Sequence, residues 1–212
     1  RLRTVTGVQT CALPICFSAA ANTWTHADYP LLLPGLIART WALTGSRSPL
    51  VPAAIELVFL LSILGTVTFG VSLLRGRKAG IFAGLFTMAV LWFGLENPQY
   101  ADMELAFYLL AANLCLWLVV PGEKPEHGLL VLAGFMAGAA VWTKNEGWAF
   151  LLAMVGVELL RTFLIRSGWL VRLRRWAALG AGLLMPLGVA LVFKVTMAPP
   201  NDLFGGSMAD TL

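Results

Sequence analysis

Two charged segments of this chain have residue types that could bind a phosphorylated substrate. YADMEL places Asp102 and Glu104 at the beginning of an apolar segment, and TKNEG places Lys144 and Glu146 between two apolar segments. A lysine amine can bind a phosphate as a point charge, and a carboxylate beside it can hold that amine in position. Two structural alternatives stay open: Asp102 suits a helix N-cap, and Lys144 with Glu146 suits a self-neutralising polar hairpin.

A third polar segment, HADYP, combines His26, Asp28 and Tyr29 with a proline. Pro30 disfavours helix at the residue before it, so the three polar side chains are predicted to lie on an extended loop. Such a loop could present acid and imidazole groups to a substrate at a membrane face; the alternative is an ordinary proline-rich connection. The residues that follow, 31–36, predict a helix lying on the membrane surface with its leucines dipping in.

Two further acids, Glu56 and Glu158, lie within apolar segments. Placing a carboxylate inside a membrane costs free energy, and a chain that keeps one there has a candidate functional residue. Each lies close to one end of its segment, so we interpret both as interfacial rather than catalytic.

The composition indicates the setting of these groups. Hydrophobic residues make up 58% of the chain and charged residues 12%, about half the charged fraction of a soluble domain, which is roughly 25%. The apolar residues form long blocks, which predicts an all-α, polytopic membrane protein. The net charge is +4, but the basic residues are not interspersed with aromatic residues as in a nucleic-acid-binding surface, so no nucleic-acid partner is expected. Cys16 and Cys115 lack metal-ligand spacing.

We predict six membrane spans, and all must be helices because backbone groups in lipid have to bond within their own segment. A span needs about 20 apolar residues, so the fourth is short and must be tightly packed or shallow. The predicted spans are 51–74, 79–97, 102–120, 128–143, 147–165 and 176–196.

The basic residues predict the orientation of the chain, because cytoplasmic loops carry the excess of Lys and Arg. One set of loops holds nine and the opposite set holds four. We assign the larger set to the cytoplasm and interpret its arginine cluster mainly as an orientation signal, with a lipid-headgroup or partner site as the alternative. The first set is Arg75, Arg77, Lys78, Lys124, Arg161, Arg166, Arg172, Arg174 and Arg175; the second is Arg39, Arg47, Lys144 and Lys194. The three polar segments then share the non-cytoplasmic side.

The beginning of the chain is interpreted differently. VTGVQTCALPI, residues 5–15, resembles the translation of a sequencing adapter, so we treat 1–15 as an artefact. We expect 16–50 to be a non-cytoplasmic loop with an interfacial helix, 51–198 the transmembrane bundle, and 199–212 the start of the next non-cytoplasmic loop.

Four segments in this order, HADYPLLLPGL, QYADMELAFYLLAA, AGAAVWTKNEG and PPNDLFGG, resemble the integral-membrane glycosyltransferases of the GT-C type. The group that the chain resembles is the bacterial dolichyl-phosphate-mannose-protein mannosyltransferase-like proteins, over most of residues 22–206, about the amino-terminal half of such an enzyme. The resemblance implies a bacterial inner-membrane enzyme that takes a sugar from a polyprenyl-phosphate donor. It transfers that sugar to a lipid, glycan or protein acceptor on the non-cytoplasmic side.

The resemblance also implies roles for residues. A loop motif that lies beside the donor phosphate in the family matches His26, Asp28 and Tyr29. A second acid of the family matches Asp102. The lysine of a Thr-Lys pair matches Lys144, and Glu146 beside it is expected to bind substrate. The family's main catalytic acid lies in the region replaced by the adapter-like segment. The catalytic residue is therefore unknown, and Asp28 is only a weak candidate for it. We expect this fragment to be inactive.

Two questions stay open at this stage. A divalent metal at the donor phosphate is an option, with His26, Asp28 and Asp102 as candidate ligands. A transporter or flippase for a lipid-linked substrate is the alternative function, and it would use Glu56, Glu158 and Lys144 along a path through the bundle. The transferase requires the His26, Asp28, Asp102 and Lys144 side chains to converge in one outer cavity.

Overall fold

The structure is a computed structural model that describes residues 31–94, 101–119, 127–164 and 168–198, with the side chains of 92–94 left out. Within these ranges it contains seven α-helices and no strand, which confirms the all-α prediction. The helices are α2 (Leu32–Thr44), α3 (Leu50–Arg75), α4 (Arg77–Gly94), α5 (Asp102–Leu118), α6 (His127–Thr143), α7 (Glu146–Leu164) and α8 (Trp169–Thr196). Segments 1–30 and 199–212 lie outside the described residues.

Three of these helices, α3, α7 and α8, are long and apolar enough to cross a membrane, with 26, 19 and 28 residues. This is compatible with an integral membrane protein. The helices α4, α5 and α6 also lie where the sequence predicts spans, but they have 18, 17 and 17 residues. The count of six spans therefore stays a prediction, while the helix positions agree with it.

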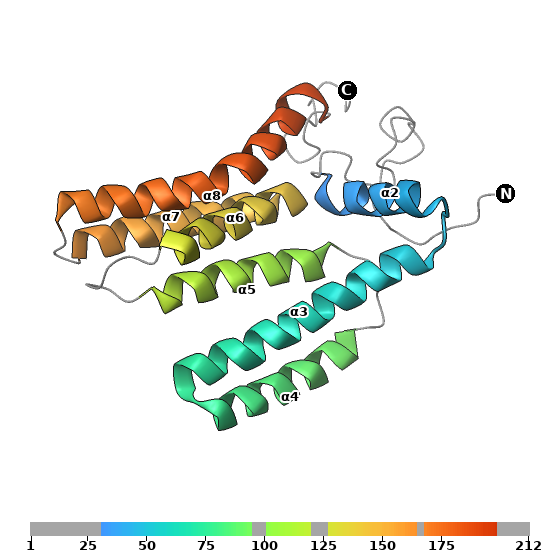
Figure 1. Cartoon of the computed structure of the whole chain (residues 1–212), viewed down its shortest axis with the longest axis horizontal. Coiled ribbons are helices and arrows are strands. Elements are labelled where there is room, and N and C mark those ends of the chain that lie inside the picture. Colours follow the sequence, from blue (N-terminus) through green and yellow to red (C-terminus); the bar gives the residue numbers. More distant parts are fainter. Residues whose placement is uncertain (1–30, 95–100, 120–126, 165–167, 199–212) are drawn as a thin grey trace, which may run out of the picture.

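The helices run back and forth between two ends of the molecule (Figure 1). Helices α5 to α8 form one group, and α3 joins this group through α5 while α4 packs on α3. The helix α2 lies at the end where α3 begins, in contact with α3 and α6. We call the end where α3, α5 and α7 begin the acidic end, since it holds Glu56, Asp102, Glu104 and Glu146; the opposite end, with Arg75, Arg161, Arg172, Arg174 and Arg175, is the basic end.

Helix α6 is the most deeply packed, as its short length predicts. Small residues let α6 and α8 approach closely: a Cβ added at Gly134 or Gly182 would collide with the backbone of the opposite helix, and one at Gly138 would meet the ring of Pro186. Pro186 lies inside α8, where it cannot donate a backbone hydrogen bond and kinks the helix. Figure 1 shows the second half of α8 bending away from α6 and α7.

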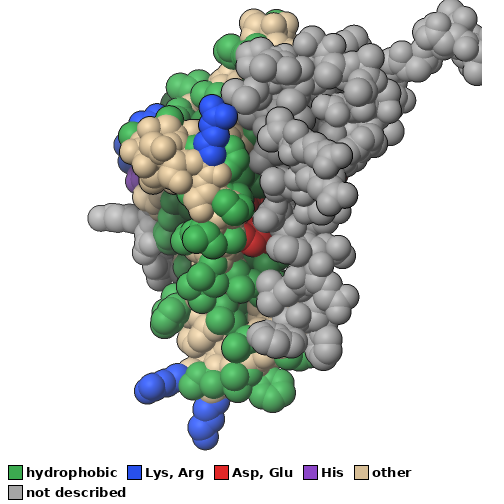
Figure 2. Space-filling view, turned by 90° about the vertical axis from the view of Figure 1, so that its right-hand side faces the viewer, with side chains coloured by type: hydrophobic (Ala, Val, Ile, Leu, Met, Phe, Trp, Pro, Cys, Tyr) green, Lys and Arg blue, Asp and Glu red, His purple; other side chains and the backbone are tan. Residues whose placement is uncertain are grey.

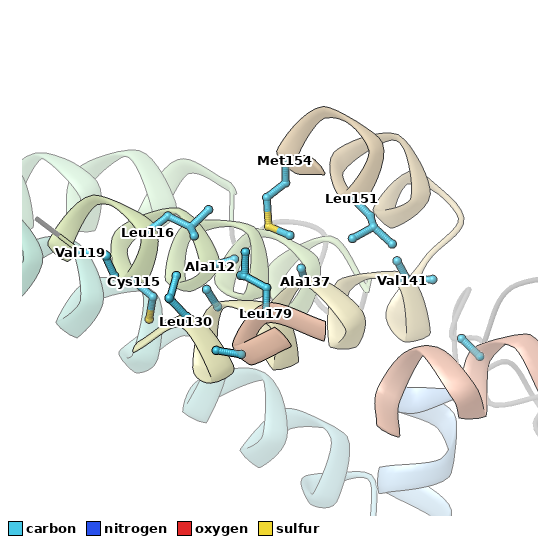
Figure 3. Packing of buried hydrophobic residues seen from close by; sticks show 13 residues of the cluster. Ala112, Cys115, Leu116, Val119, Leu130, Ala137, Val141, Leu151, Met154 and Leu179 are labelled. Atoms are coloured by element: carbon cyan, nitrogen blue, oxygen red, sulfur yellow. The ribbon is translucent and has the colours of Figure 1, made fainter. Parts of the chain in front are cut away.

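The core fills the space between α5, α6, α7 and α8 with aliphatic side chains and alanines (Figure 3). Outside this core, the surface is unusually apolar for a protein in water. Phe69, Phe82, Leu85, Phe163 and Val195 are each more than 60% exposed, and Figure 2 shows hydrophobic side chains over much of the part of this face that is not grey. An exposed apolar surface of this extent is typical of a lipid-facing protein.

Helices α3 and α4 form a hairpin that is held by a different kind of contact. Gly80 and Gly84 of α4 face the hydroxyl side chains of Ser72 and Thr68 on α3, and a Cβ at either glycine would overlap a hydroxyl oxygen. Both hydroxyls donate to backbone carbonyls one turn earlier in α3, so they leave no unsatisfied polar group in the contact. The close approach therefore explains why this face of α4 carries glycines.

Candidate functional site

The acidic end brings together two of the three polar segments that the sequence singles out. The Lys144 Nζ lies 2.7 Å from Asp102 Oδ1 and 3.5 Å from Glu146 Oε1. The Lys144 side chain is only 15% exposed, whereas Asp102 and Glu146 are 60% and 54% exposed. The amine is thus held in place by carboxylates from two helices, α5 and α7, with one side of the cluster open.

These contacts decide between the alternatives that the sequence leaves open. Ala101, not Asp102, occupies the N-cap position of α5, and no side chain caps that helix. Asp102 is the first helical residue and pairs with Lys144, so the capping interpretation is wrong. The self-neutralising hairpin accounts for only part of the geometry, because the shorter contact of Lys144 goes to Asp102 on another helix.

The turn that carries Lys144 is fixed by its own hydrogen bonds. The Thr143 hydroxyl donates to the Ala139 carbonyl, and the Lys144 amide donates to the Ala140 carbonyl. The Gly147 amide then donates to the Lys144 carbonyl, and a Cβ at Gly147 would collide with the Ala140 backbone. The turn is therefore shorter than predicted, since α7 already begins at Glu146.

Another carboxylate lies at the same end, deeper in the structure. Glu104 is 2% exposed, and neither of its side-chain oxygens has a hydrogen-bond partner within the described part of the chain. Glu56 on α3 and Asp102 are close enough to interact with it electrostatically. The sequence marks Glu104 as an additional acid but does not predict its burial or its isolation.

Aromatic side chains lie next to this carboxylate on the inward side. Tyr108, one helical turn after Glu104 on α5, packs edge-on against Phe59 of α3 with the ring centroids 5.7 Å apart. Phe107 makes a similar contact with Phe59 at 5.6 Å. Glu56 lies about one turn before Phe59, so the two glutamates face the space between α3 and α5 at the same level.

An open apolar groove of about 490 Å³ borders the acidic end. It lies between the last turns of α8, the end of α6 and the residue that precedes α2. Trp142, which lines it, is two residues before Lys144, and Leu31 directly follows the HADYP segment in the sequence. The lining residues are Leu31, Trp142, Met185, Gly188, Val189, Val192, Phe193 and Met197.

The helix predicted after Pro30 is present as α2. Leu33 and Ile37 are buried in a small cluster with Ala101, whereas Leu36 is 39% exposed. The Trp41 ring nitrogen donates to the Ser48 carbonyl at 3.0 Å, which fixes the connection to α3. Two apolar residues of α2 therefore pack against the rest of the protein, and the position of α2 on a membrane surface stays a prediction.

The remaining predicted site residues, His26, Asp28 and Tyr29, lie outside the described residues. Among the residues that are described, no group of three His, Cys, Asp or Glu side chains could hold a metal ion. Of the three candidate ligands only Asp102 is placed, and its Oδ1 is in contact with Lys144. The predicted metal site, two of whose ligands lie outside the described residues, therefore stays a prediction.

The basic end contains a second buried carboxylate, with a different environment. Glu158 is 3% exposed; its Oε1 lies 3.3 Å from Arg161 and its Oε2 lies 2.8 Å from Arg175. Arg161 also donates to the carbonyls of Leu116 and Val119, at 3.2 and 2.7 Å, where α5 ends. Glu158 thus joins α7 to α8, and its partner Arg161 joins α7 to the end of α5.

Sequence reasoning interpreted Glu158 as interfacial and the arginines mainly as an orientation signal. The i,i+3 spacing of Glu158 and Arg161 could have indicated an ion pair on one helix face. The contact between Glu158 and Arg175 has no local signal, because it depends on how α7 and α8 each pack against α6.

The chain matches no protein-family model, no curated protein and no solved structure.

Proposed function

We propose that this chain is part of a membrane glycosyltransferase that uses a sugar carried on a polyprenyl phosphate. The observation that carries the proposal is the contact of Lys144 with Asp102, 42 residues apart in sequence and 2.7 Å apart in space. It joins two segments on which the resemblance to such enzymes rests. In this proposal the chain crosses the membrane six times, and its acidic end faces the non-cytoplasmic side.

The chemistry of a polyprenyl-phosphate donor fits the groups found together. The phosphate becomes a leaving group, and a positioned cation stabilises the charge that develops on it. Lys144 supplies that cation, and Asp102 and Glu146 fix its position while leaving the cluster open on their exposed sides. The hydrocarbon chain of the lipid needs an apolar groove, and the groove lined by Trp142 lies at the same end of the bundle as Lys144.

The transporter alternative has less support from the described residues. It needs Glu158 and Lys144 along one path, yet Glu158 lies 12 residues into α7, about 18 Å from its start at a rise of 1.5 Å per residue. Both oxygens of Glu158 already contact arginines. A substrate path through this position would first have to break two buried ion pairs.

The test is binding, since it does not require the whole enzyme. Polyprenyl phosphate without sugar would be titrated against the chain in lipid nanodiscs and followed by native mass spectrometry. Lys144→Ala is expected to weaken binding about tenfold or more, because a hydrogen bond to a charged group contributes roughly 1.5–3 kcal/mol. Lys78→Ala, the same charge change at the basic end, is expected to leave binding within about twofold.

The groove is tested by filling it. Gly188 lines the groove and a Cβ added there meets nothing within 4 Å, so Gly188→Leu would occupy the space without a clash in the fold. Gly180→Leu is the matched control, because Gly180 lies on the same helix, also has open space, and does not line the groove. Equal binding of polyprenyl phosphate by both variants and by the Lys144→Ala variant would refute the proposed function.

A further inference from the structure

Glu104 is a buried carboxylate that the fold does not neutralise. Glu104 is 2% exposed and, among the described residues, neither of its side-chain oxygens accepts a hydrogen bond from another residue. Taking a carboxylate out of water costs several kcal/mol unless hydrogen bonds or opposite charges replace the water. A native protein that keeps such a group needs a reason for it, and a role in binding or catalysis is one.

The neighbours of Glu104 increase this cost. The nearest charged groups that act on it, Glu56 and Asp102, are both acids. Lys144, an amine at this end, contacts Asp102 and Glu146 instead. A ligand that donates hydrogen bonds to Glu104 would therefore relieve an unfavourable interaction as well as form a new one.

The surroundings also restrict the chemistry of that ligand. No trio of His, Cys, Asp or Glu within the described ranges is arranged to hold a metal ion, so we consider an organic hydrogen-bond donor. The rings of Tyr108 and Phe59 lie one turn further inward and offer apolar contact. A carboxylate beside an aromatic surface suits a sugar, which has hydroxyl groups at its edge and C–H groups on its faces.

We propose that Glu104 accepts hydrogen bonds from the hydroxyl groups of the sugar on the lipid donor, while Lys144 holds the phosphate. Both positions lie at the acidic end, since Asp102 contacts Lys144 and also interacts electrostatically with Glu104. This inference rests on the proposed function and assigns the sugar-binding group within it. A carboxylate that has lost its water discriminates strongly against a ligand that lacks the donor hydroxyl.

The experiment compares two lipids in nanodiscs, polyprenyl phosphate alone and polyprenyl phosphate carrying one of several hexoses or pentoses. The unmodified chain is expected to bind at least one glycosylated lipid about tenfold more tightly than the bare lipid. Glu104→Ala is expected to remove this preference and to leave the affinity for the bare lipid within about twofold. Glu104→Gln, which keeps one carbonyl acceptor, is expected to retain part of the preference.

The outcomes separate this inference from the proposed function. Failure of the unmodified chain to bind either lipid refutes both. Binding of the bare lipid with no preference for any glycosylated lipid, or an unchanged preference in Glu104→Ala, refutes the role of Glu104 alone. Thermal unfolding of each variant in the same nanodiscs shows that it is folded, and Glu104→Met serves as a second variant that lacks a buried charge.

Discussion

The two buried glutamates of this chain lie at opposite ends of the helix bundle and have opposite surroundings. Glu158 is 3% exposed and each of its oxygens contacts an arginine. Glu104 is 2% exposed and, within the residues the structure describes, has no hydrogen-bond partner. Equal burial therefore accompanies very different electrostatic environments.

The difference indicates different roles for the two ends. Glu158 uses its charge to hold α7 and α8 together and, through Arg161, to hold the end of α5. Each of its oxygens already has a cationic partner inside the fold. Glu104 contributes nothing comparable to the fold, and its unsatisfied oxygens are consistent with the sugar-binding role proposed above.

The largest expected effect is at the basic end. Glu158→Ala is expected to lower the free energy of unfolding by about 3–5 kcal/mol, because it leaves two partly buried arginines without their shared partner. Denaturation in detergent micelles by increasing SDS would measure the change. A loss below about 1 kcal/mol would mean that the arginines find water or lipid headgroups instead, and that Glu158 does not join the helices.

The next effect concerns the arginine that extends this network. Arg161→Met is expected to cost roughly 1.5–3 kcal/mol, since the Leu116 and Val119 carbonyls lose a charged donor. The same denaturation measurement applies. Arg174→Met, an exposed arginine on α8, is the matched control and is expected to change stability by less than about 0.5 kcal/mol.

At the acidic end, removal of the buried glutamate is expected to stabilise the protein rather than destabilise it. Glu104→Met is expected to raise the free energy of unfolding by roughly 0.5–2 kcal/mol, because an unbranched apolar side chain of similar length replaces an unpaired buried charge. Destabilisation by this variant would contradict the view that Glu104 is unsatisfied in the folded protein. The comparison with Glu158→Ala would then lose its basis.

The smallest effect on stability is expected for the ion pair in the candidate site. Asp102→Asn is expected to change the free energy of unfolding by less than about 1 kcal/mol, because Asp102 is 60% exposed and exposed ion pairs contribute little. A loss of 2 kcal/mol or more would indicate that the contact of Lys144 with Asp102 holds α5 to the α6–α7 turn, as the basic-end network does, rather than serving a ligand.

Much of the fold could be predicted from local sequence patterns. The predicted span at 51–74 corresponds to α3, that at 128–143 to α6 and that at 147–165 to α7, each within one residue at both ends. The prediction for α8 began too late, because the arginines before residue 176 were assigned to a loop although they continue the same helix. Arginine is a good helix former, so charge alone did not mark the helix start.

The candidate site could be predicted only in part. The segments with Asp102 and Lys144 were expected to share one end, and the structure brings their side chains into contact. The isolation of Glu104 was not predicted, because burial of a side chain depends on which neighbouring helices cover it. The apolar groove was expected only in general terms, since its lining combines α6, α8 and the residue before α2.

By itself the sequence determined approximately where the helices lie and at which end of the bundle each polar segment lies. Both follow from local chemistry: apolar runs must satisfy their backbone within one helix, and consecutive antiparallel helices alternate the ends at which their connections lie. Only the tertiary structure decided which charges meet. Whether a carboxylate is paired, as Glu158 is with Arg175, or left unsatisfied, as Glu104 is, depends on the rotation and separation of packed helices, and no local periodicity encodes these.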